Sequence, residues 1–364
     1  KRKMFITFLV TLAFLAAFTR AIQYSGVNEA GLEFRGAGTS CAPQAGSLQQ
    51  FSSQGHNIFR VPFSWEDLQP CFRCEFNYDF LNGLDNVVNN ILSRGDIALI
   101  DCHNYFRYNG GLLPEGDTDS YANLWYRLAL HYTNNDRIWF GLMNEPHDMT
   151  TEMVFNFHQQ AIWTIRSTGN LNKIVISGNG WDGLTHWADT VAYYGTPNSK
   201  LALMDDTANN HVYEMHIYFD TAGSGAYGTC DYIDWNKIQA TTDWLRSVGK
   251  KAIITEFGLG NNDNCVYNFG EVFLKYLSSN QDVYDGYTYW AAGTCWPNNY
   301  VFTVDPNNAV SIANDRRVQL LSNYSAHSRS NEISQSNSAF QTNYCNVSLT
   351  VAVLYIVLVL LSFV

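Results

Sequence analysis

Gly141-Leu142-Met143-Asn144-Glu145-Pro146-His147 directly follows a short apolar run, Arg137-Ile138-Trp139-Phe140. The pattern indicates a buried strand whose last residues turn polar before a proline stops it. Asn and Pro also favour turns, so a surface turn is the alternative interpretation. A buried strand that presents a carboxyl side chain at its C-terminal tip is typical of a catalytic barrel, and the rest of the chain favours that interpretation.

Short apolar, β-rich runs recur along the chain and alternate with stretches of helical periodicity. Eight such strands predict an α/β fold, a (β/α)8 TIM barrel, formed by one catalytic domain at residues 22–321. An open, doubly wound sheet is the alternative, but no Gly-rich phosphate loop follows the first strand. The expected strands are Tyr24–Asn28, Ile58–Pro62, Ile97–His103, Ile138–Asn144, Lys173–Gly178, Val212–Tyr218, Lys251–Glu256 and Gly286–Trp290. The expected helices include Phe80–Ser93, Tyr121–Thr133, Glu152–Thr168, Trp235–Val248 and Phe269–Ser278.

The ends of the chain carry two apolar segments outside this domain. Residues 1–21, with basic Lys1, Arg2 and Lys3 before an apolar run, predict a signal peptide. A polar Ser/Asn-rich linker at 322–346 precedes an apolar tail at 347–364, which indicates a GPI-anchor signal or, as the alternative, a short membrane anchor. Both interpretations predict a secreted protein or one on the extracellular face of the plasma membrane or cell wall. Sequons at Asn323 and Asn346 indicate a glycoprotein.

The composition indicates which class of partner the protein binds and whether its cysteines form disulfide bonds. A net charge of −11 argues against a nucleic-acid partner, while 22 Tyr and 10 Trp offer flat faces for sugar rings. Most of the eight cysteines of a secreted chain should form disulfide bonds, and six of them allow 15 pairings. Cys102, inside an apolar strand, is expected to be a buried free thiol, and Cys345, near the end of the linker, would be removed with the tail if the GPI interpretation holds. Cys71 and Cys74 have metal-like spacing but no second Cys or His pair, so we expect no metal and no cofactor.

Polar side chains stand at the C-terminal ends of the expected strands, which converge on one face of a barrel. Glu145 and Glu256 are the two carboxylates, and two such groups suit glycosidic bond cleavage: one protonates the leaving oxygen and the other attacks the anomeric carbon. Arg60 and Tyr218 are placed to hold Glu256, and His216 to hydrogen-bond near Glu145. We expect the following side chains to bind or support the substrate: Arg60, His103, Asn144, His216, Tyr218 and Trp290, with Trp65 and Trp181 extending the cleft.

The chain resembles glycoside hydrolase family 5 over roughly residues 23–310. The resemblance rests on Tyr24-Ser-Gly-Val-Asn-Glu-Ala-Gly31, Phe59-Arg-Val-Pro-Phe-Ser-Trp65, Ile100-Asp-Cys-His-Asn-Tyr105, Gly141–His147, Glu214-Met-His-Ile-Tyr218, Ile254-Thr-Glu-Phe-Gly258 and Tyr289-Trp-Ala-Ala-Gly293. It implies a (β/α)8 barrel, anomeric retention, Glu145 as acid/base and Glu256 as nucleophile. The family's eight-residue active-site set maps onto Arg60, His103, Asn144, Glu145, His216, Tyr218, Glu256 and Trp290.

Details of the loops resemble the fungal-type endo-β-1,4-glucanases (cellulases) of that family. The similarity lies in His103-Asn-Tyr-Phe-Arg-Tyr-Asn-Gly110 and Ser177-Gly-Asn-Gly-Trp-Asp-Gly183. The chain departs from the family after the last strand, where Gly293-Thr-Cys295-Trp296-Pro297 would reshape the subsites near Trp296. The resemblance implies a β-1,4-linked polysaccharide substrate and a monomer. A β-mannanase or mixed-linkage β-glucanase with the same mechanism is the first alternative, and a non-catalytic carbohydrate-binding surface protein is the second.

Overall fold

The computed structural model describes residues 22–327, apart from residues 134, 190–195, 298 and 307–313. The predicted signal peptide, most of the polar linker and the whole apolar tail lie outside the described residues and stay predictions, as does Asn346 as a glycosylation site. Within the described part of the chain, every helix is too short or too polar to cross a membrane. The last helix continues through Asn323, so it crosses the domain boundary predicted at residue 321.

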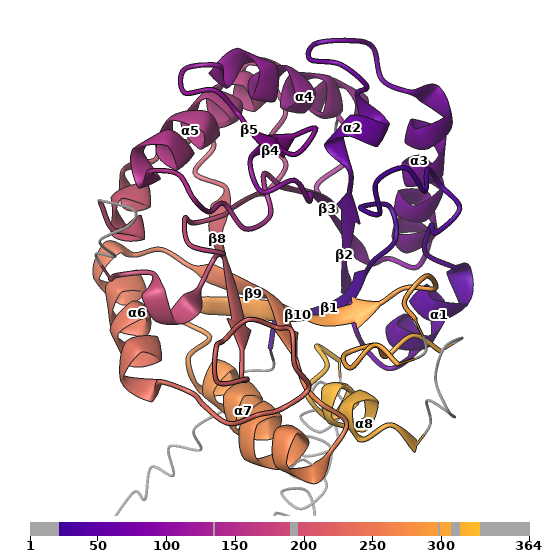
Figure 1. The fold of residues 1–364 in the computed structure, drawn as a ribbon, viewed down its shortest axis with the longest axis vertical. Coiled ribbons are helices and arrows are strands. Elements are labelled where there is room, and N and C mark those ends of the chain that lie inside the picture. Colours follow the sequence, from indigo (N-terminus) through magenta and orange to yellow (C-terminus); the bar gives the residue numbers. More distant parts are fainter. Residues whose placement is uncertain (1–21, 134, 190–195, 298, 307–313, 328–364) are drawn as a thin grey trace, which may run out of the picture.

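Eight parallel strands close into a barrel, which confirms the predicted (β/α)8 fold and excludes the open sheet (Figure 1). Around the barrel the strand order is β1, β10, β9, β8, β7, β6, β3 and β2, and β1 closes on β2. Each strand lies within three residues of an expected one at its first residue. The strands are β1 (Tyr24–Glu29), β2 (Ile58–Phe63), β3 (Ile97–Cys102), β6 (Ile138–Gly141), β7 (Ile174–Ile176), β8 (His211–Tyr218), β9 (Ala252–Gly258) and β10 (Tyr284–Ala292).

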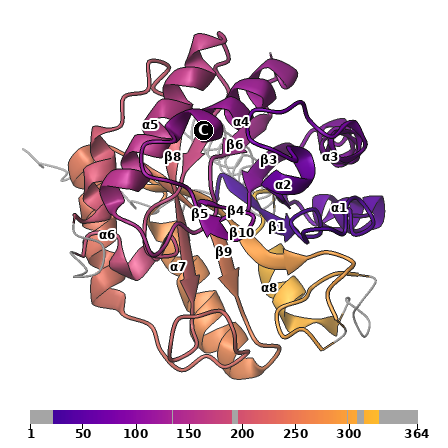
Figure 2. The same ribbon diagram turned by 45° about the horizontal axis from the view of Figure 1, so that its top comes forward.

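Helices surround the strands (Figure 2), and the five that were predicted are present. The fifth begins as a π-helical turn, η3 (Asn264–Gly270), before it becomes regular. After β7 the structure has two 3-10 helices, η1 (Leu184–His186) and η2 (Asn198–Leu203), and after β3 it has a small hairpin of β4 (Arg107–Tyr108) and β5 (Gly111–Leu112). The α-helices are α1 (Ala45–Ser53), α2 (Trp65–Leu68), α3 (Tyr78–Ser93), α4 (Thr118–His131), α5 (Thr151–Ser167), α6 (Trp235–Val248), α7 (Glu271–Ser279) and α8 (Arg316–Asn323).

The helices pack on the barrel through apolar stripes, as α3 illustrates. Its side chains Phe80, Leu84, Val88 and Ile91 recur every three or four residues and are buried. Asn77 caps the helix, because its side chain accepts hydrogen bonds from the first free backbone N–H groups, those of Asp79 and Phe80. The resulting core between strands and helices fixes the strand directions, and therefore the positions of the side chains at the strand ends.

Inside the barrel, an apolar layer lies below a polar one. The apolar layer is one buried cluster with a residue from each of six strands: Ile58, Leu99, Trp139, Val175, Val212 and Ile253. Side chains two residues further along a strand point to the same side. That step leads to Arg60, Asp101, Glu214 and Thr255, all of which are completely buried. The strand period therefore places charged groups inside the barrel, just below its C-terminal mouth.

Within residues 22–327, the structure has three disulfide bonds: Cys41–Cys295, Cys71–Cys74 and Cys230–Cys265. Cys102 is buried and free, as predicted. Cys71 and Cys74, whose spacing resembles that of metal ligands, bond to each other. The two ends of the described chain also meet, because the Ala326 N–H donates to Ser25 Oγ (2.8 Å) at the beginning of β1.

Candidate active site

Glu256, near the end of β9, lies at the barrel mouth with both carboxylate oxygens hydrogen-bonded. Arg60 Nη1 donates to Oε1 at 2.8 Å, and Tyr218 Oη donates to Oε2 at 2.7 Å. The Glu256 side chain keeps 5% of its exposure, so it is nearly buried but accessible from the mouth. A cation and a phenol thus hold this carboxylate in one orientation.

Arg60 is completely buried and is the centre of a polar network inside the barrel. Besides Glu256, it contacts Glu214 at 2.8 Å and Asp101 at 3.0 Å, and it donates to the Asn144 side-chain oxygen at 2.7 Å. Burial alone would raise the pKa of Glu214, but the Arg60 charge and the neighbouring hydrogen bonds together outweigh burial and lower that pKa to about 2. The guanidinium therefore balances carboxylates from three strands, which fixes their relative positions.

Glu145 follows β6 in a backbone conformation that side-chain-bearing residues seldom adopt. Its φ is 45°. Such a conformation costs ~1 to 3 kcal/mol and persists only where surrounding contacts hold it. Its N–H donates to Asp182 Oδ2 at 2.9 Å, and its carbonyl oxygen accepts from His147 Nδ1 at 2.8 Å. The carboxyl group keeps 17% of its exposure, more than Glu256 does.

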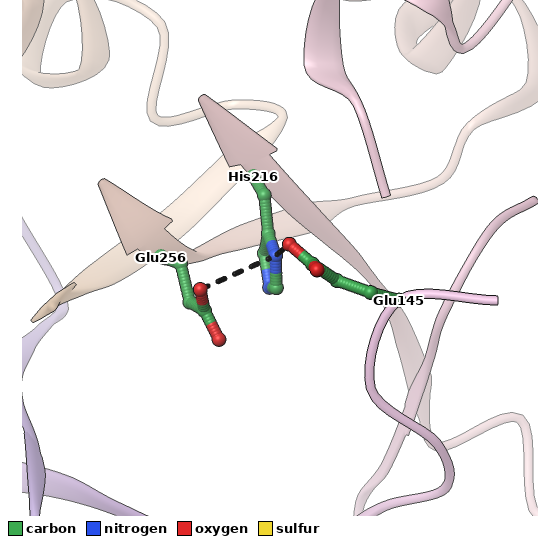
Figure 3. Close-up of side chains that lie close together, drawn as sticks. All are labelled: Glu145, His216 and Glu256. Atoms are coloured by element: carbon green, nitrogen blue, oxygen red, sulfur yellow. Dashed lines mark hydrogen bonds and ion pairs between the residues drawn. The ribbon is translucent and has the colours of Figure 1, made fainter. Parts of the chain in front are cut away.

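His216, on β8, lies between the two glutamates (Figure 3). Its Nδ1 is 2.8 Å from Glu145 Oε1 and 3.7 Å from Glu256 Oε2. Its Nε2 is 2.9 Å from Thr255 Oγ1 and 3.3 Å from Glu214 Oε1. Burial disfavours the charged imidazole, but the neighbouring carboxylates outweigh burial and raise the pKa of His216 well above its usual value.

Among the residues that the structure describes, two sets of side chains could in principle ligate a metal ion: Glu145, His216 and Glu256, and Asp182, Glu214 and His216. Their ligand atoms lie within 4.8 Å of one another in each set. Both nitrogens of His216 already make hydrogen bonds, and its raised pKa favours the protonated imidazole, which cannot ligate. The donor set therefore suits proton chemistry better than metal binding.

His103 and Trp290 form the opposite wall of the mouth. Their rings stack at 5.5 Å with an interplanar angle of 11°. Asp101 holds His103 Nδ1 at 2.9 Å, while Asn144 Nδ2 donates to His103 Nε2 at 3.2 Å. Burial and the Arg60 charge lower the pKa of His103 to about 4, so its ring is neutral. Both side-chain groups of Asn144 are thereby engaged within the protein.

The three remaining predicted tryptophans differ in position. Trp181 is 46% exposed and stacks on His147 at 4.7 Å. Trp296 stacks on Tyr300 at 4.1 Å beside Trp290, in the loop that the Cys41–Cys295 bond fixes. The prediction for Trp65 is wrong, because its side chain is completely buried and its Nε1 donates to Gln69. Trp65 begins helix α2 after the Ser64 cap, and the helical turn directs the ring into the core, away from the cleft.

A cavity of about 690 Å³ opens beside Glu145. Among the described residues, its lining comes mainly from the segments after β6, β7 and β8, and it includes Glu145 but not Glu256. Trp181 and Tyr232 contribute aromatic rings, and Asp220 and Asp234 contribute carboxyl groups. The cavity therefore extends the mouth on the side of Glu145.

The sequence analysis missed Asp101, Glu214 and Asp182 as site residues. The first two had a signal: Asp101 lies two residues before His103, and Glu214 two before His216, so each shares a strand face with a predicted site residue. Asp182 had none, because its position depends on how the loop after β7 folds back onto Glu145.

Comparisons with known proteins agree with this geometry. The sequence model of Cellulase (glycosyl hydrolase family 5) matches residues 20–294. Probable endo-beta-1,4-glucanase B of Neosartorya fischeri is 36% identical over 296 residues, which cover 78% of this chain and 86% of that protein. Endo-beta-1,4-glucanase A of Emericella nidulans is 34% identical over 312 residues, which cover 82% of this chain and 92% of that protein.

Solved structures show the same likeness. The structure of XacCel5A in complex with cellopentaose has a TM-score of 0.78 at 32% identity, covering 84% of this chain and 99% of that one. Cel5A (EG2) from Hypocrea jecorina has a TM-score of 0.72 at 27% identity, covering 82% and 98%. The fold and site thus define a glycoside hydrolase. The chain belongs to glycosyl hydrolase family 5, the cellulase family.

Proposed function

We propose that the protein is a retaining endo-β-1,4-glucanase that hydrolyses internal bonds of a β-1,4-linked glucan. Family membership supports the reaction class, and the relatives named above support the glucan. The cellopentaose bound to the structurally similar XacCel5A supports a β-1,4-linked chain as the ligand of the cleft. No cofactor takes part in the proposed reaction.

The observation that carries the proposed stereochemistry is the short separation of the two carboxyl groups. An oxygen of Glu145 and an oxygen of Glu256 lie within 4.8 Å of each other. Retaining enzymes place their carboxyl groups about 5 Å apart, whereas inverting enzymes need about 6.5 to 9.5 Å to admit a water molecule. The geometry therefore supports double displacement with retention.

In the first step, Glu256 Oε attacks the anomeric carbon while Glu145 gives its proton to the leaving glycosidic oxygen. The sugar–oxygen bond breaks, and a covalent glycosyl-enzyme forms. Arg60 and Tyr218 keep Glu256 oriented for attack, and the hydrogen bond from His216 Nδ1 orients Glu145. In the second step, Glu145 takes a proton from water, and the water oxygen displaces Glu256 from the sugar.

Other groups at the mouth bind the sugars on either side of the broken bond. Trp290 offers a ring face for the sugar that Glu256 attacks, with His103 stacked behind it. The Asn144 side chain already accepts a hydrogen bond from Arg60 and donates one to His103. Its proposed contact with a sugar hydroxyl would therefore be made in addition to these two hydrogen bonds. The cavity beside Glu145 would receive the leaving sugars, with Trp181 as its aromatic surface.

Proton NMR of the first product formed from cellopentaose tests the mechanism. We expect the β-anomer to appear before mutarotation, and initial release of the α-anomer would overturn retention. Glu256→Ala should lower the rate of hydrolysis by a factor of at least ~10⁴, because the covalent glycosyl-enzyme cannot form without that carboxylate. Unchanged activity in this variant would overturn the assignment of the nucleophile.

Substrate choice is tested by reducing-sugar release from carboxymethyl-cellulose, mannan and mixed-linkage β-glucan. We expect activity on carboxymethyl-cellulose with a mixture of internal cleavage products. Activity on mannan alone would keep the mechanism and change the substrate. Binding without hydrolysis of any of the three would favour the non-catalytic carbohydrate-binding alternative.

The predicted signal peptide and tail support an extracellular location, attached to the membrane through residues 347–364. Treatment of intact cells with a phosphatidylinositol-specific phospholipase should release the enzyme if the tail is replaced by a GPI anchor. Retention on the cells after treatment would favour a membrane span.

A further inference from the structure

Asp182 lies in the loop after β7 and contacts the backbone of both partners of the Glu145–His216 pair. Its Oδ2 accepts the Glu145 N–H at 2.9 Å, and its backbone carbonyl accepts the His216 N–H at 2.9 Å. The ring of contacts closes through the side chains, since His216 Nδ1 is 2.8 Å from Glu145 Oε1. Asp182 is completely buried. This closed ring leaves the Glu145 carboxyl group little freedom to move away from His216.

The loop that carries Asp182 is itself held in an uncommon conformation. Gly180, Trp181 and Asp182 have consecutive φ values of 77°, 57° and 55°. Such strain persists only where other contacts fix it, and it concentrates at functional sites. Here the Gly180 and Trp181 N–H groups donate to the Pro146 carbonyl oxygen at 2.8 and 3.1 Å, and the Gly178 N–H donates to Asp182 Oδ1 at 2.5 Å. The loop is therefore joined to the chain at Glu145 itself and at Pro146, the residue after it.

Glu145 needs such support because its own conformation is unfavourable. It has a positive φ and precedes Pro146, and residues before proline avoid helical conformations of the backbone. Each Asp182 carboxyl oxygen accepts one backbone N–H, so the carboxyl group links the end of β7 to the strained residue after β6. Loss of one of these two acceptors would release the Glu145 backbone and move its carboxyl group.

We propose that Asp182 is a positioning residue for the general acid, holding the Glu145 carboxyl group at the leaving glycosidic oxygen. The inference rests on the proposed function, in which Glu145 protonates that oxygen. Asp182 has no contact with the nucleophile in this arrangement, so its effect should fall on protonation of the leaving group. Substrates whose leaving group departs without a proton should therefore be insensitive to it.

The test compares kcat/KM of Asp182→Asn on two cellobiosides that differ in the leaving group. Phenyl β-cellobioside needs acid assistance, whereas 2,4-dinitrophenyl β-cellobioside does not. Since a small misplacement of a catalytic group can cost about 10²-fold, we expect a loss of that order on the phenyl substrate and less than about threefold on the dinitrophenyl substrate. An equal loss on both substrates, or none on either, would overturn the proposal.

Glu145→Gln, measured in parallel, separates this proposal from the proposed function. Like Asp182→Asn, it should lose more kcat/KM on the phenyl substrate than on the dinitrophenyl substrate, and the difference should be larger. If Glu145→Gln is selective and Asp182→Asn is not, Asp182 has no positioning role and Glu145 remains the acid. If Glu145→Gln also lacks selectivity, the acid assignment fails and the Asp182 inference fails with it.

Asp206→Asn is the matched control for disturbing a buried aspartate. Its carboxyl group also accepts two backbone N–H groups, from Ala208 (3.1 Å) and Asn210 (2.9 Å), but before β8, at the opposite end of the barrel. It should change kcat/KM of both cellobiosides by the same factor. Asp182→Asn retains the shape of the side chain, and thermal unfolding of each variant checks that the enzyme assayed is folded.

Discussion

Tyr218 illustrates how a single hydroxyl group can matter at the residue scale. Its O–H donates to the Glu256 carboxylate, and burial raises the pKa of Tyr218 well above its usual value, so the phenol keeps its proton. A hydrogen bond to a charged group contributes about 1.5 to 3 kcal/mol. If the proposed mechanism holds, Tyr218→Phe should lower kcat roughly 10- to 100-fold. Steady-state kinetics on carboxymethyl-cellulose would measure this loss.

Tyr213→Phe is the control for Tyr218→Phe. Tyr213 lies on the same strand and is completely buried, but its hydroxyl donates to the Leu201 carbonyl oxygen at 2.9 Å, away from the carboxylates. Removing that hydroxyl should lower the stability and leave kcat of the folded enzyme unchanged. Equal kcat losses in the two variants would contradict a specific role for Tyr218.

At the residue scale, the strand period could place site residues that lie on the strands, but not those in the segments that follow the strands. Arg60, His216, Tyr218 and Glu256 could be placed because each stands near a strand end and alternation fixes its side. Trp65 could not, because it begins helix α2 directly after the Ser64 cap, and the helix turns its ring into the core. Asp182 depends on left-handed loop residues, which side-chain sequence patterns do not specify.

At the element scale, the disulfide bonds differ in how much of the chain they close. Cys41–Cys295 spans 254 residues, whereas Cys71–Cys74 spans three. Because longer loops lose more entropy on cross-linking, the double variant Cys41→Ser/Cys295→Ser should lose about 5 kcal/mol of unfolding free energy, and Cys71→Ser/Cys74→Ser at most about 2 kcal/mol. Urea unfolding of both variants measures the difference, and equal losses would contradict the loop-entropy argument.

The elements themselves were largely predictable, and the disulfide partners were not. Apolar runs and helical periodicity are local signals, so all eight strands and five helices could be read from the sequence. The pairing of Cys41 with Cys295 requires that the loops after the first and last strands be neighbours, which follows only from closure of β1 on β10. The 3-10 helices after β7 lack the apolar stripe that identifies a longer helix.

At the scale of the whole molecule, buried carboxyl groups predict a loss of stability as the pH rises from 4.5 to 8. Burial raises the pKa of Glu29 and of Glu33 to about 8, from an unfolded value of 4.5. Between pH 4.5 and 8, these two carboxyl groups therefore keep their protons in the folded chain and have lost them in the unfolded chain. The stability that depends on protonated Glu29 and Glu33 is fully present below pH 4.5 and is lost as the pH rises through 8. Denaturant unfolding at pH 6 and pH 8 should show the decrease.

Glu29→Gln isolates one of these groups. Glu29 Oε1 accepts from Ser47 Oγ at 2.7 Å, and the neutral amide can accept the same hydrogen bond. The variant should lose less stability than the wild type between pH 6 and 8, by up to roughly 1.4 kcal/mol per pH unit. Glu75→Gln, with a side chain 74% exposed, serves as the control and should follow the wild type. An identical pH dependence in all three proteins would show that Glu29 ionises normally.

The contact between Ala326 and Ser25 has a practical consequence for handling this enzyme. Ser25 is at the beginning of β1, so position 327 lies near the N-terminal ends of the strands. The two glutamates lie at the other end of the barrel, where the strands end. A bead or electrode coupled through a side chain at position 327 would face the end that carries no chemistry. The immobilised protein would keep its two glutamates directed toward the solution, where a long polymer can reach them.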